Sequence, residues 1–591
     1  MEDESPSLKA LLNELEEMTE EIDEGYIFDA ISKLQQNGDA GQPPMDWLAE
    51  RIAFQFREQH GETDSPSGTY FCPMMVLRND DGTITEVPSL HELTPEIMNY
   101  WSIRAEKATH PVFKARYADL VWEFSKTVTG TVPSYRIAHI AIDSIVKIAK
   151  RDCYRFNIDV IRKLERALSL ALSLGDDLRI QTVRDTILAY EDKIAEDNKP
   201  GLWGFSYDLL FHNKKIPLSE SQRKSVISAL EERLRRLSMP TAEGAMNGWR
   251  AEHAALRLAE YYRRNDCQED LSRVLGAFGT AWEYAAKTGS PLQASHWLQR
   301  VHSVYLKYGL TQEAADVAVK LRQIGSEMGA DLKAITDEYE IPQEEFERFI
   351  SAMTEGDLDI VLRRIAAHFI PSRDEVACQL AELAKKAPLS FLFPIQLQDH
   401  KGRPVATIGS LEGDLDGRIV YQMTQNMQIS FTFLQESIAA TRAKFSLSAD
   451  GLATYLYRSP VFQEDKRAVL QEGLRAYFDG RHMIAAHIFI PQIEDAFRAL
   501  IELQGGAVLK TGRAGGFHLK TLDELLRDSR VAAVMGEDTA FYFRVLLTDP
   551  RGWNLRNDLC HGILPTSTFN TMMTDRLLHV LLCLGNLRGT Q

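Results

Sequence analysis

The segment of the chain that is best suited to chemistry lies near its end, at residues 553–562. It contains Arg556, Asn557 and His561. Because Asn557 precedes His561 by four residues, both side chains lie on one face of a predicted helix. Arg556 is about 140° away around that helix, but its long side chain can reach the same cleft.

These three residue types can cleave RNA without a metal ion. The imidazole of His561 moves a proton from or to the 2′-hydroxyl and the leaving oxygen. The guanidinium of Arg556 binds the phosphate in a bidentate manner and stabilises the charge of the pentacoordinate phosphorus. The amide of Asn557 positions the imidazole or a phosphate oxygen. Gly562 and Pro565 predict the end of the helix, which leaves His561 in its last turn.

The spacing between the arginine and the histidine is weak evidence by itself. Arg363 and His368 have the same spacing, and so do Arg513 and His518. Arg556 differs from these because an asparagine follows it and because glycine follows its histidine. A second interpretation stays open at this point, in which the three side chains form a buried polar brace that holds a helical bundle together.

Several helices must position these residues. Their apolar periodicity predicts segments at 480–504, 521–529, 537–548, 553–561 and 567–588. A glycine-rich break at 505–516 is predicted to be a flexible loop between helices. This loop and the residues after it are rich in positive charge and poor in acid, which makes four side chains candidates for RNA contact: Lys510, Arg513, His518 and Lys520.

The rest of the chain is also predicted to be mainly α. Residues 94–369 are almost wholly helical, and two segments resemble each other at an offset of 43 residues, which loosely resembles tetratricopeptide-like repeats. A non-repeating helical domain is the alternative. Small β-hairpins are expected near 74–87 and 393–409. The predicted parts are an acidic N-terminal segment with a small hairpin at 1–93, a helical, solenoid-like region at 94–390, a hairpin with a helical connector at 391–479, and a helical domain at 480–591.

Acidic residues are concentrated at the beginning of the chain. The formal net charge is −17, and residues 1–60 hold fifteen acidic and four basic side chains. An acidic helix is expected at 5–24. The N-terminus lacks the features of a signal peptide, no apolar stretch is long enough to cross a membrane, and the six cysteines are scattered. We therefore expect a cytoplasmic protein that does not associate with a membrane and that holds no metal ion or cofactor.

Residues 555–562 resemble the signature of the HEPN superfamily (higher eukaryotes and prokaryotes nucleotide-binding domains), in which an arginine and a polar residue precede a histidine. Together with the upstream helix at 487–498, they are similar to an uncharacterised bacterial family whose C-terminal domain belongs to this class. The resemblance covers about residues 480–591. Arg556, Asn557 and His561 match the motif position by position.

Four further residues belong to this resemblance as supporting positions: Asn554, Asp558, Glu494 and Arg498. Asp558 departs from the apolar residues that are usual between the arginine and the histidine, and it can tune His561 or cap the helix. Glu494 and Arg498 are spaced as an i,i+4 pair, for which a purely structural role is the alternative.

The resemblance implies a helical bundle that forms a homodimer, with two Arg/His pairs facing one shared cleft. It further implies a metal-independent endoribonuclease with an RNA substrate, acting as a toxin or in antiviral defence against phage. The N-terminal helical region is then expected to bind a regulatory protein or a phage-derived trigger. The competing hypothesis is a non-catalytic helical adaptor that dimerises through a degenerate bundle of the same class.

Overall fold

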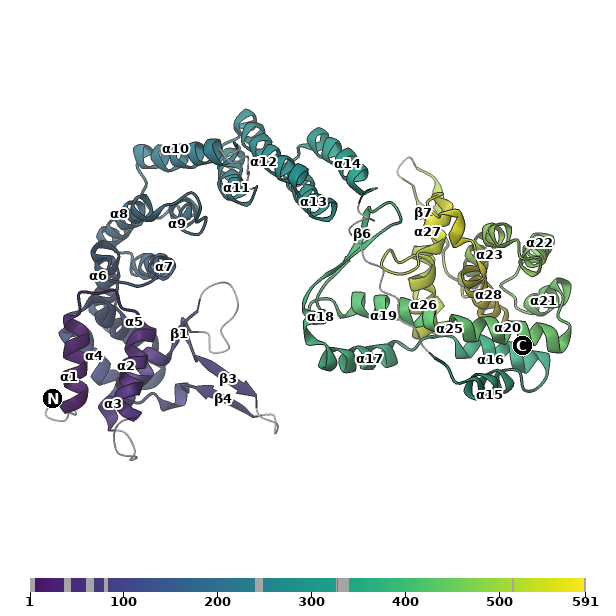
Figure 1. Ribbon diagram of the computed structural model, residues 1–591, viewed down its shortest axis with the longest axis horizontal. Coiled ribbons are helices and arrows are strands. Elements are labelled where there is room, and N and C mark those ends of the chain that lie inside the picture. The colour runs from purple at the N-terminus through teal and green to yellow at the C-terminus, as the bar shows by residue number, and fades with distance from the viewer. Residues whose placement is uncertain are drawn as a thin grey trace. The chain divides into compact units, whose positions relative to one another are not determined.

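The computed structural model confirms the predicted fold class, because the chain is mainly α with a few short antiparallel strand pairs. It describes residues 6–36, 44–59, 69–78, 83–239, 248–325, 327, 340–512 and 515–588. The chain divides into two compact units, residues 1–318 and 319–591 (Figure 1). The finer boundaries at 93, 390 and 479 remain predictions.

Unit 1 is a series of helices in which sequence neighbours pack on one another, as α4 does on α5, α5 on α6, α11 on α12 and α12 on α13. This order of packing is typical of stacked helical arrays. The helices are α1 (Pro6–Glu17), α2 (Glu24–Gln36), α3 (Met45–Gln55), α4 (Pro95–Lys107), α5 (Pro111–Thr129), α6 (Tyr135–Arg151), α7 (Asn157–Leu174), α8 (Asp177–Ile194), α9 (Phe205–Leu210), α10 (Glu220–Leu237), α11 (Gly248–Arg264), α12 (Gln268–Thr288) and α13 (Pro291–Lys307), while α14 (Thr311–Gly325) crosses into unit 2.

The offset of 43 residues recurs in the helix boundaries of unit 1. Helix α11 ends at Arg264 and α13 ends at Lys307, while α12 begins at Gln268 and α14 begins at Thr311. The chain also leaves the two helices in the same way. The Cys267 amide donates to the Tyr262 carbonyl at 3.0 Å, and 43 residues later the Leu310 amide donates to the Tyr305 carbonyl at 2.9 Å. Two consecutive helix pairs therefore share one local design.

The strands of unit 1 form two small antiparallel pairs. β1 (Arg57–Glu58) pairs with β2 (Phe71–Cys72), and β3 (Met75–Arg78) pairs with β4 (Ile84–Val87). The second pair is the hairpin that the sequence predicts near 74–87. Residues 79–82, which join the two strands, lie outside the described residues.

The predicted acidic helix at 5–24 is wrong in its second half. Helix α1 ends at Glu17, α2 begins at Glu24, and residue 5 lies outside the described residues. Between the two helices, Ile22 is fully buried and forms a parallel bridge with Tyr154. Its amide donates to the Cys153 carbonyl at 3.2 Å. This long-range pairing replaces helical hydrogen bonds that a local pattern alone would favour.

A buried ammonium group connects distant segments of unit 1. Lys163 Nζ lies 2.7 Å from Glu24 Oε1 and 2.6 Å from Glu58 Oε1, and the lysine side chain is almost wholly buried. Burial alone would lower the pKa of Lys163, but the two carboxylates raise it above its usual value. Burial would likewise raise the pKa of Glu58, but Lys163 and Arg116 lower it. Each charge in this cluster therefore depends on its partners.

Replacing Lys163 with methionine is expected to lower the free energy of unfolding by about 3–5 kcal/mol, because two carboxylates lose their buried counter-charge. Urea unfolding followed by circular dichroism measures the loss. Lys193→Met is the matched control, since Lys193 is exposed and forms a surface pair with Asp152. Its loss is expected to stay below about 1 kcal/mol. Equal losses in the two variants would show that the Lys163 cluster contributes no more than a surface pair.

Unit 2 is built around its last helix, α28, which packs against α16, α20, α21 and α23. The helices of this unit are α15 (Gln343–Met353), α16 (Leu358–His368), α17 (Arg373–Lys386), α18 (Pro388–Leu392), α19 (Leu415–Ile429), α20 (Phe431–Phe445), α21 (Ala449–Leu456), α22 (Arg467–Phe478), α23 (His482–Leu503), α24 (Leu522–Leu526), α25 (Ser529–Met535), α26 (Glu537–Leu547), α27 (Leu555–Cys560) and α28 (Thr571–Gly585). Leu577, Leu581 and Leu584 of α28 are fully buried, so this helix forms much of the core of unit 2.

Two hairpins accompany these helices. β5 (Ile395–Gln398) pairs with β6 (Pro404–Ile408), as the sequence predicts near 393–409. The prediction of a flexible loop at the glycine-rich break is wrong. The segment forms a hairpin, in which β7 (Leu509–Thr511) pairs with β8 (Phe517–Leu519). The Gly512 amide donates to the Gly516 carbonyl at 3.0 Å, and Gly516 has a φ of 83° that favours glycine.

Helix α28 also carries ionisable groups into the core. Asp575 is 1% exposed and Arg576 is fully buried. Burial raises the pKa of Asp575 to about 6, although a hydrogen bond from the Tyr477 hydroxyl (2.6 Å) and the charge of Arg576 both lower it. The folded protein therefore binds the Asp575 proton more tightly than the unfolded chain does.

Protonated Asp575 is expected to add its full contribution to the free energy of unfolding below about pH 4. This contribution is expected to be lost as the pH rises to about 6. The substitution Asp575→Asn keeps the shape of the side chain and removes its charge. The variant is expected to gain about 2–3 kcal/mol relative to the parent between pH 4 and pH 7. Urea unfolding of both proteins across this range gives the difference. A difference that does not change with pH would contradict a raised pKa for Asp575.

Candidate functional site

The motif helix α27 is only six residues long and is held by its ends. It begins after Asn554, which has a φ of 52° in the left-handed region, where asparagine is tolerated. The predicted helix at 553–561 is therefore too long at its start. Before it, the Trp553 amide donates to the Val545 carbonyl at 2.9 Å, which holds the loop against α26. Leu555 anchors the helix in the core at 3% exposure.

The end of α27 has the hydrogen bonds of a Schellman motif. The Ile563 amide donates to the Asp558 carbonyl at 2.8 Å, and the Gly562 amide donates to the Leu559 carbonyl at 3.0 Å. Gly562 has a φ of 64°. His561 is the residue that caps the helix, as the sequence predicts. The glycine after the histidine thus fixes the place where His561 leaves the helix.

Arg556 is oriented by a carboxylate from the longest helix of unit 2. Its Nε donates to Glu494 Oε2 on α23 at 3.0 Å, and its Nη1 donates to Asn557 Oδ1 at 3.4 Å. Glu494 is buried and also forms an ion pair with Arg498. Within the described residues, Nη2 of Arg556 forms no hydrogen bond. One edge of the guanidinium is therefore fixed, and Nη2 remains to bind a ligand.

Asn557 belongs to a chain of amide and carboxyl groups. Its Nδ2 donates to Asn554 Oδ1 at 2.8 Å and to the Thr548 carbonyl at 3.3 Å. Asn554 Nδ2 in turn donates to Asp558 Oδ1 at 2.8 Å. We predicted that Asn557 positions His561 or a phosphate oxygen. Among the described residues its side chain contacts Arg556 and Asn554 instead, so its role in this state is to orient the arginine.

His561 is the exposed member of the set. Its side chain is exposed, and its ring forms no hydrogen bond within the part of the chain that the structure describes. The nearest charge is Asp558, whose pKa is raised by burial and by Asp399, and lowered by the Asn554 hydrogen bond and by His561. The structure thus brings Arg556 and Asn557 into contact, and leaves the imidazole open to solvent at the end of the same helix.

A pocket of about 550 Å³ lies beside the motif. Three parts of unit 2 form its walls: the β5–β6 hairpin, helix α19 and the loop that leads into α27. Asn554 and Asp558 line it together with Tyr421, Trp553 and Arg403. The sequence indicated the hairpin and the motif separately. Their contact joins segments about 150 residues apart, for which the sequence offers no local signal.

Two of the four candidate RNA-contact residues, Lys510 and Lys520, are paired with acidic side chains. Lys510 Nζ lies 2.7 Å from Glu524 Oε1, and Lys520 Nζ lies 3.4 Å from Asp528 Oδ2. His518 is exposed on β8. Arg513 lies outside the described residues. The two lysines are therefore neutralised by acids of the helices that follow the hairpin.

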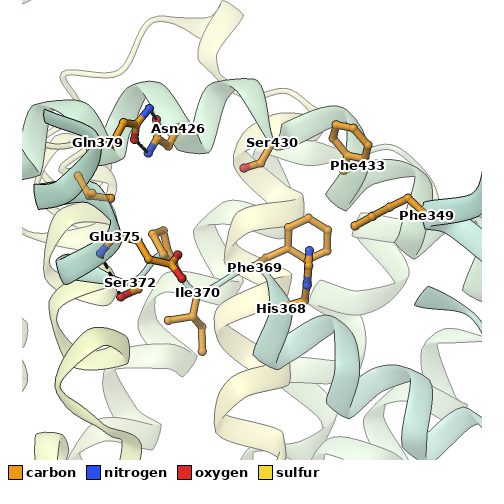
Figure 2. A pocket seen from close by; sticks show the side chains of 12 residues that line it. Phe349, His368, Phe369, Ile370, Ser372, Glu375, Gln379, Asn426, Ser430 and Phe433 are labelled. Carbon is orange, nitrogen blue, oxygen red and sulfur yellow. Dashed lines mark hydrogen bonds between the residues drawn. The ribbon is translucent and has the colours of Figure 1, made fainter. Parts of the chain in front are cut away.

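A second pocket in unit 2, of about 510 Å³, is lined by residues of α15, α16, α17, α19 and α20. Figure 2 shows that the amides of Gln379 and Asn426 bond to each other, with Nδ2 of Asn426 donating at 2.8 Å. The opposite side gathers aromatic rings: Phe349, His368, Phe369 and Phe433. Phe349 packs edge-on against Phe433 at 4.9 Å. His368 and Glu375 both line this pocket, but among the described residues no hydrogen bond or ion pair joins them.

Comparison with known proteins gives one match, outside the motif. A family model described as a domain of unknown function (DUF7380) matches residues 48–183, in unit 1. No curated protein and no solved structure matches the chain. Within the described residues, no helix combines the length and the apolar character needed to cross a membrane.

Gly562→Ala is expected to lower the free energy of unfolding by about 1–2 kcal/mol, because alanine is strained at a positive φ. Open space surrounds the position where a Cβ would stand, so the cost comes from the backbone alone. Gly562→Asn is the control and should cost less, since asparagine tolerates this region. Thermal and urea unfolding measure both. If alanine were tolerated as well as asparagine, the Schellman geometry at His561 would be wrong.

Proposed function

We propose that the chain is a metal-independent endoribonuclease of the cytoplasm, whose C-terminal region is a HEPN-like bundle that forms a homodimer. Its site consists of Arg556, Asn557 and His561. The observation that supports this most is the placement of the Arg556 and His561 side chains. Glu494 and Asn557 hold Arg556 while leaving Nη2 without a partner among the described residues, and the His561 ring is exposed five residues later.

In this proposal the RNA itself supplies the nucleophile. The 2′-oxygen attacks the neighbouring phosphorus, its proton passes to the imidazole of His561, and the bond from phosphorus to the 5′-oxygen breaks. A second imidazole, from the partner chain of the dimer, gives a proton to that leaving oxygen. Arg556 binds the non-bridging oxygens through Nη1 and Nη2, where negative charge develops. No step requires a metal ion or a cofactor.

The local balance of charge also favours phosphate at this position. Glu494 lies between Arg498 and Arg556, so that two guanidinium groups share one carboxylate. These three side chains together therefore keep one net positive charge, although α23 and α27 taken as whole helices carry more acidic than basic residues. Because Glu494 is 8% exposed, its carboxylate is largely hidden from solvent and is occupied by the two arginines. The arginine is thus both held in place and available.

We further propose that the protein acts as a toxin or in anti-phage defence, with the helices of unit 1 binding a regulatory protein or a phage-derived trigger. Paired helices with one shared local design offer a repeated surface of the kind that stacked arrays use for partners. Control by a partner would also let a host tolerate such an enzyme. The free protein is accordingly expected to be weakly active.

Arg556→Ala and His561→Ala are each expected to slow cleavage of labelled single-stranded RNA at least about 100-fold. The assay contains EDTA and follows the fragments by gel electrophoresis. Arg363→Ala and His368→Ala form the matched control, because this pair has the same spacing on α16. Their rates should equal that of the parent. Cleavage at the parental rate by both motif variants would refute the assignment.

One observation favours a second function, in which the same domain is a non-catalytic adaptor. The contact of Arg556 with buried Glu494 ties α27 to α23, as a structural brace would. An adaptor predicts dimers that leave RNA intact and cells that tolerate expression. The nuclease predicts growth arrest on expression, relieved by His561→Ala. Size-exclusion chromatography and growth curves of the two strains distinguish these functions.

A further inference from the structure

The pocket beside the motif shares two residues with it. Asn554 and Asp558 line the pocket, and both belong to the hydrogen-bonded chain that runs through Asn557 to Arg556. Arg556 itself does not line the pocket, and its connection to the pocket runs through the side chains of Asn557 and Asn554. At about 550 Å³ the pocket is within the range of small-molecule sites. It can accept one nucleobase with its ribose.

The cations of this pocket are already paired with acids. Arg403 forms an ion pair with Asp399 at 2.5 Å. Arg551 pairs with Asp549 at 2.8 Å and with Asp416 at 3.0 Å. These contacts leave little net positive charge in the pocket. It is consequently a poor site for phosphate and suits an uncharged part of a ligand.

The remaining lining is flat, apolar or able to accept hydrogen bonds. Tyr421, Trp553, Pro404 and Pro550 supply rings, and Asp558 supplies a carboxyl. Among the described residues, the single hydrogen bond to that carboxyl comes from Asn554. Aromatic surface beside a hydrogen-bonding carboxyl is the arrangement by which proteins hold an unstacked base and contact its edge.

We propose that this pocket binds one unpaired nucleobase of the RNA, next to the phosphate that Arg556 holds. The inference rests on the proposed function, and it defines the substrate as single-stranded at that position. A base that is paired in a duplex cannot enter, because its edge and its stacking faces are already occupied.

Asp558 gives the pocket a preference among bases. Adenine and cytosine present an exocyclic amino group, which donates to a carboxylate. Uracil presents a single ring N–H between two carbonyl oxygens, and these oxygens repel the carboxylate. The site is therefore selective for a base that carries an amino group.

The test measures binding rather than cleavage. His561→Ala removes an exposed ring that forms no hydrogen bond among the described residues, so it stops the reaction while the pocket stays intact. Fluorescence anisotropy then compares labelled oligoadenylate, oligocytidylate and oligouridylate of eight nucleotides. The first two are expected to bind about tenfold more tightly than oligouridylate. A duplex of the same length should bind without a dependence on Asp558.

Further variants in the His561→Ala background locate the preference. Asp558→Ala should abolish it, and Asp558→Asn should retain part of it through the amide oxygen. Tyr421→Leu should weaken all three oligonucleotides by about tenfold without changing their order. Asp374→Asn, on the exposed start of α17, is the control and should leave every affinity unchanged. Circular dichroism confirms that each variant is folded.

The outcomes separate this inference from the proposed function. Equal affinity for the three oligonucleotides, a uniform loss in Asp558→Ala, or no binding at all overturns the nucleobase pocket. Cleavage by the parent protein decides the nuclease proposal independently. A preference that depends on Asp558, found together with a parent protein that never cleaves, would support the pocket and reject the nuclease.

Discussion

The ion pair between Glu494 and Arg556 is the constraint on which the motif depends. Helix α27 has six residues, too few to be stable in water by its own hydrogen bonds. Helix α23 has 22 residues and lies in the core of unit 2. The Glu494 carboxylate on this long helix fixes the direction of Arg556, while buried Leu555 and the Schellman turn at Gly562 fix the two ends of α27. The position of α27 therefore depends on its contact with α23.

Buried charge recurs in both units, and each time it joins segments that are distant in sequence. Lys163 connects α2, β1 and α7, and Glu494 connects α23 with α27. Such pairs are costly to desolvate and costly to break. They tolerate few alternative arrangements, since any shift would leave a buried charge without its partner. In unit 2 this specificity includes Arg556, a residue of the proposed site.

The sequence predicts what depends on local pattern. The helix pairs of unit 1, the hairpin near 74–87 and the end of α27 after His561 follow from periodicity, turn residues and glycine. The sequence does not predict contacts between residues that are far apart along the chain. Nothing near Arg556 indicates that Glu494, 62 residues earlier, will hold it, although the i,i+4 spacing of Glu494 and Arg498 signals their own pair. Ile22 differs from prediction for the same reason, because its bridge partner Tyr154 is far along the chain. The β7–β8 hairpin is local, but its short strands are joined by glycine-rich residues that also favour a loop.

The structure holds the Arg556 side chain by hydrogen bonds and leaves the His561 ring exposed, and the chemistry of the proposed function would account for this difference. An arginine that must recognise one phosphate geometry gains from being held, since less conformational freedom is lost on binding. A histidine that moves protons must meet the 2′-hydroxyl and then exchange its proton with water, so an exposed ring is suitable. Placing Arg556 in the anchored helix α27 and His561 at its C-terminal cap satisfies both needs. The pocket at Asp558 adds a third element, because a base held beside the phosphate would set which bond the exposed imidazole meets.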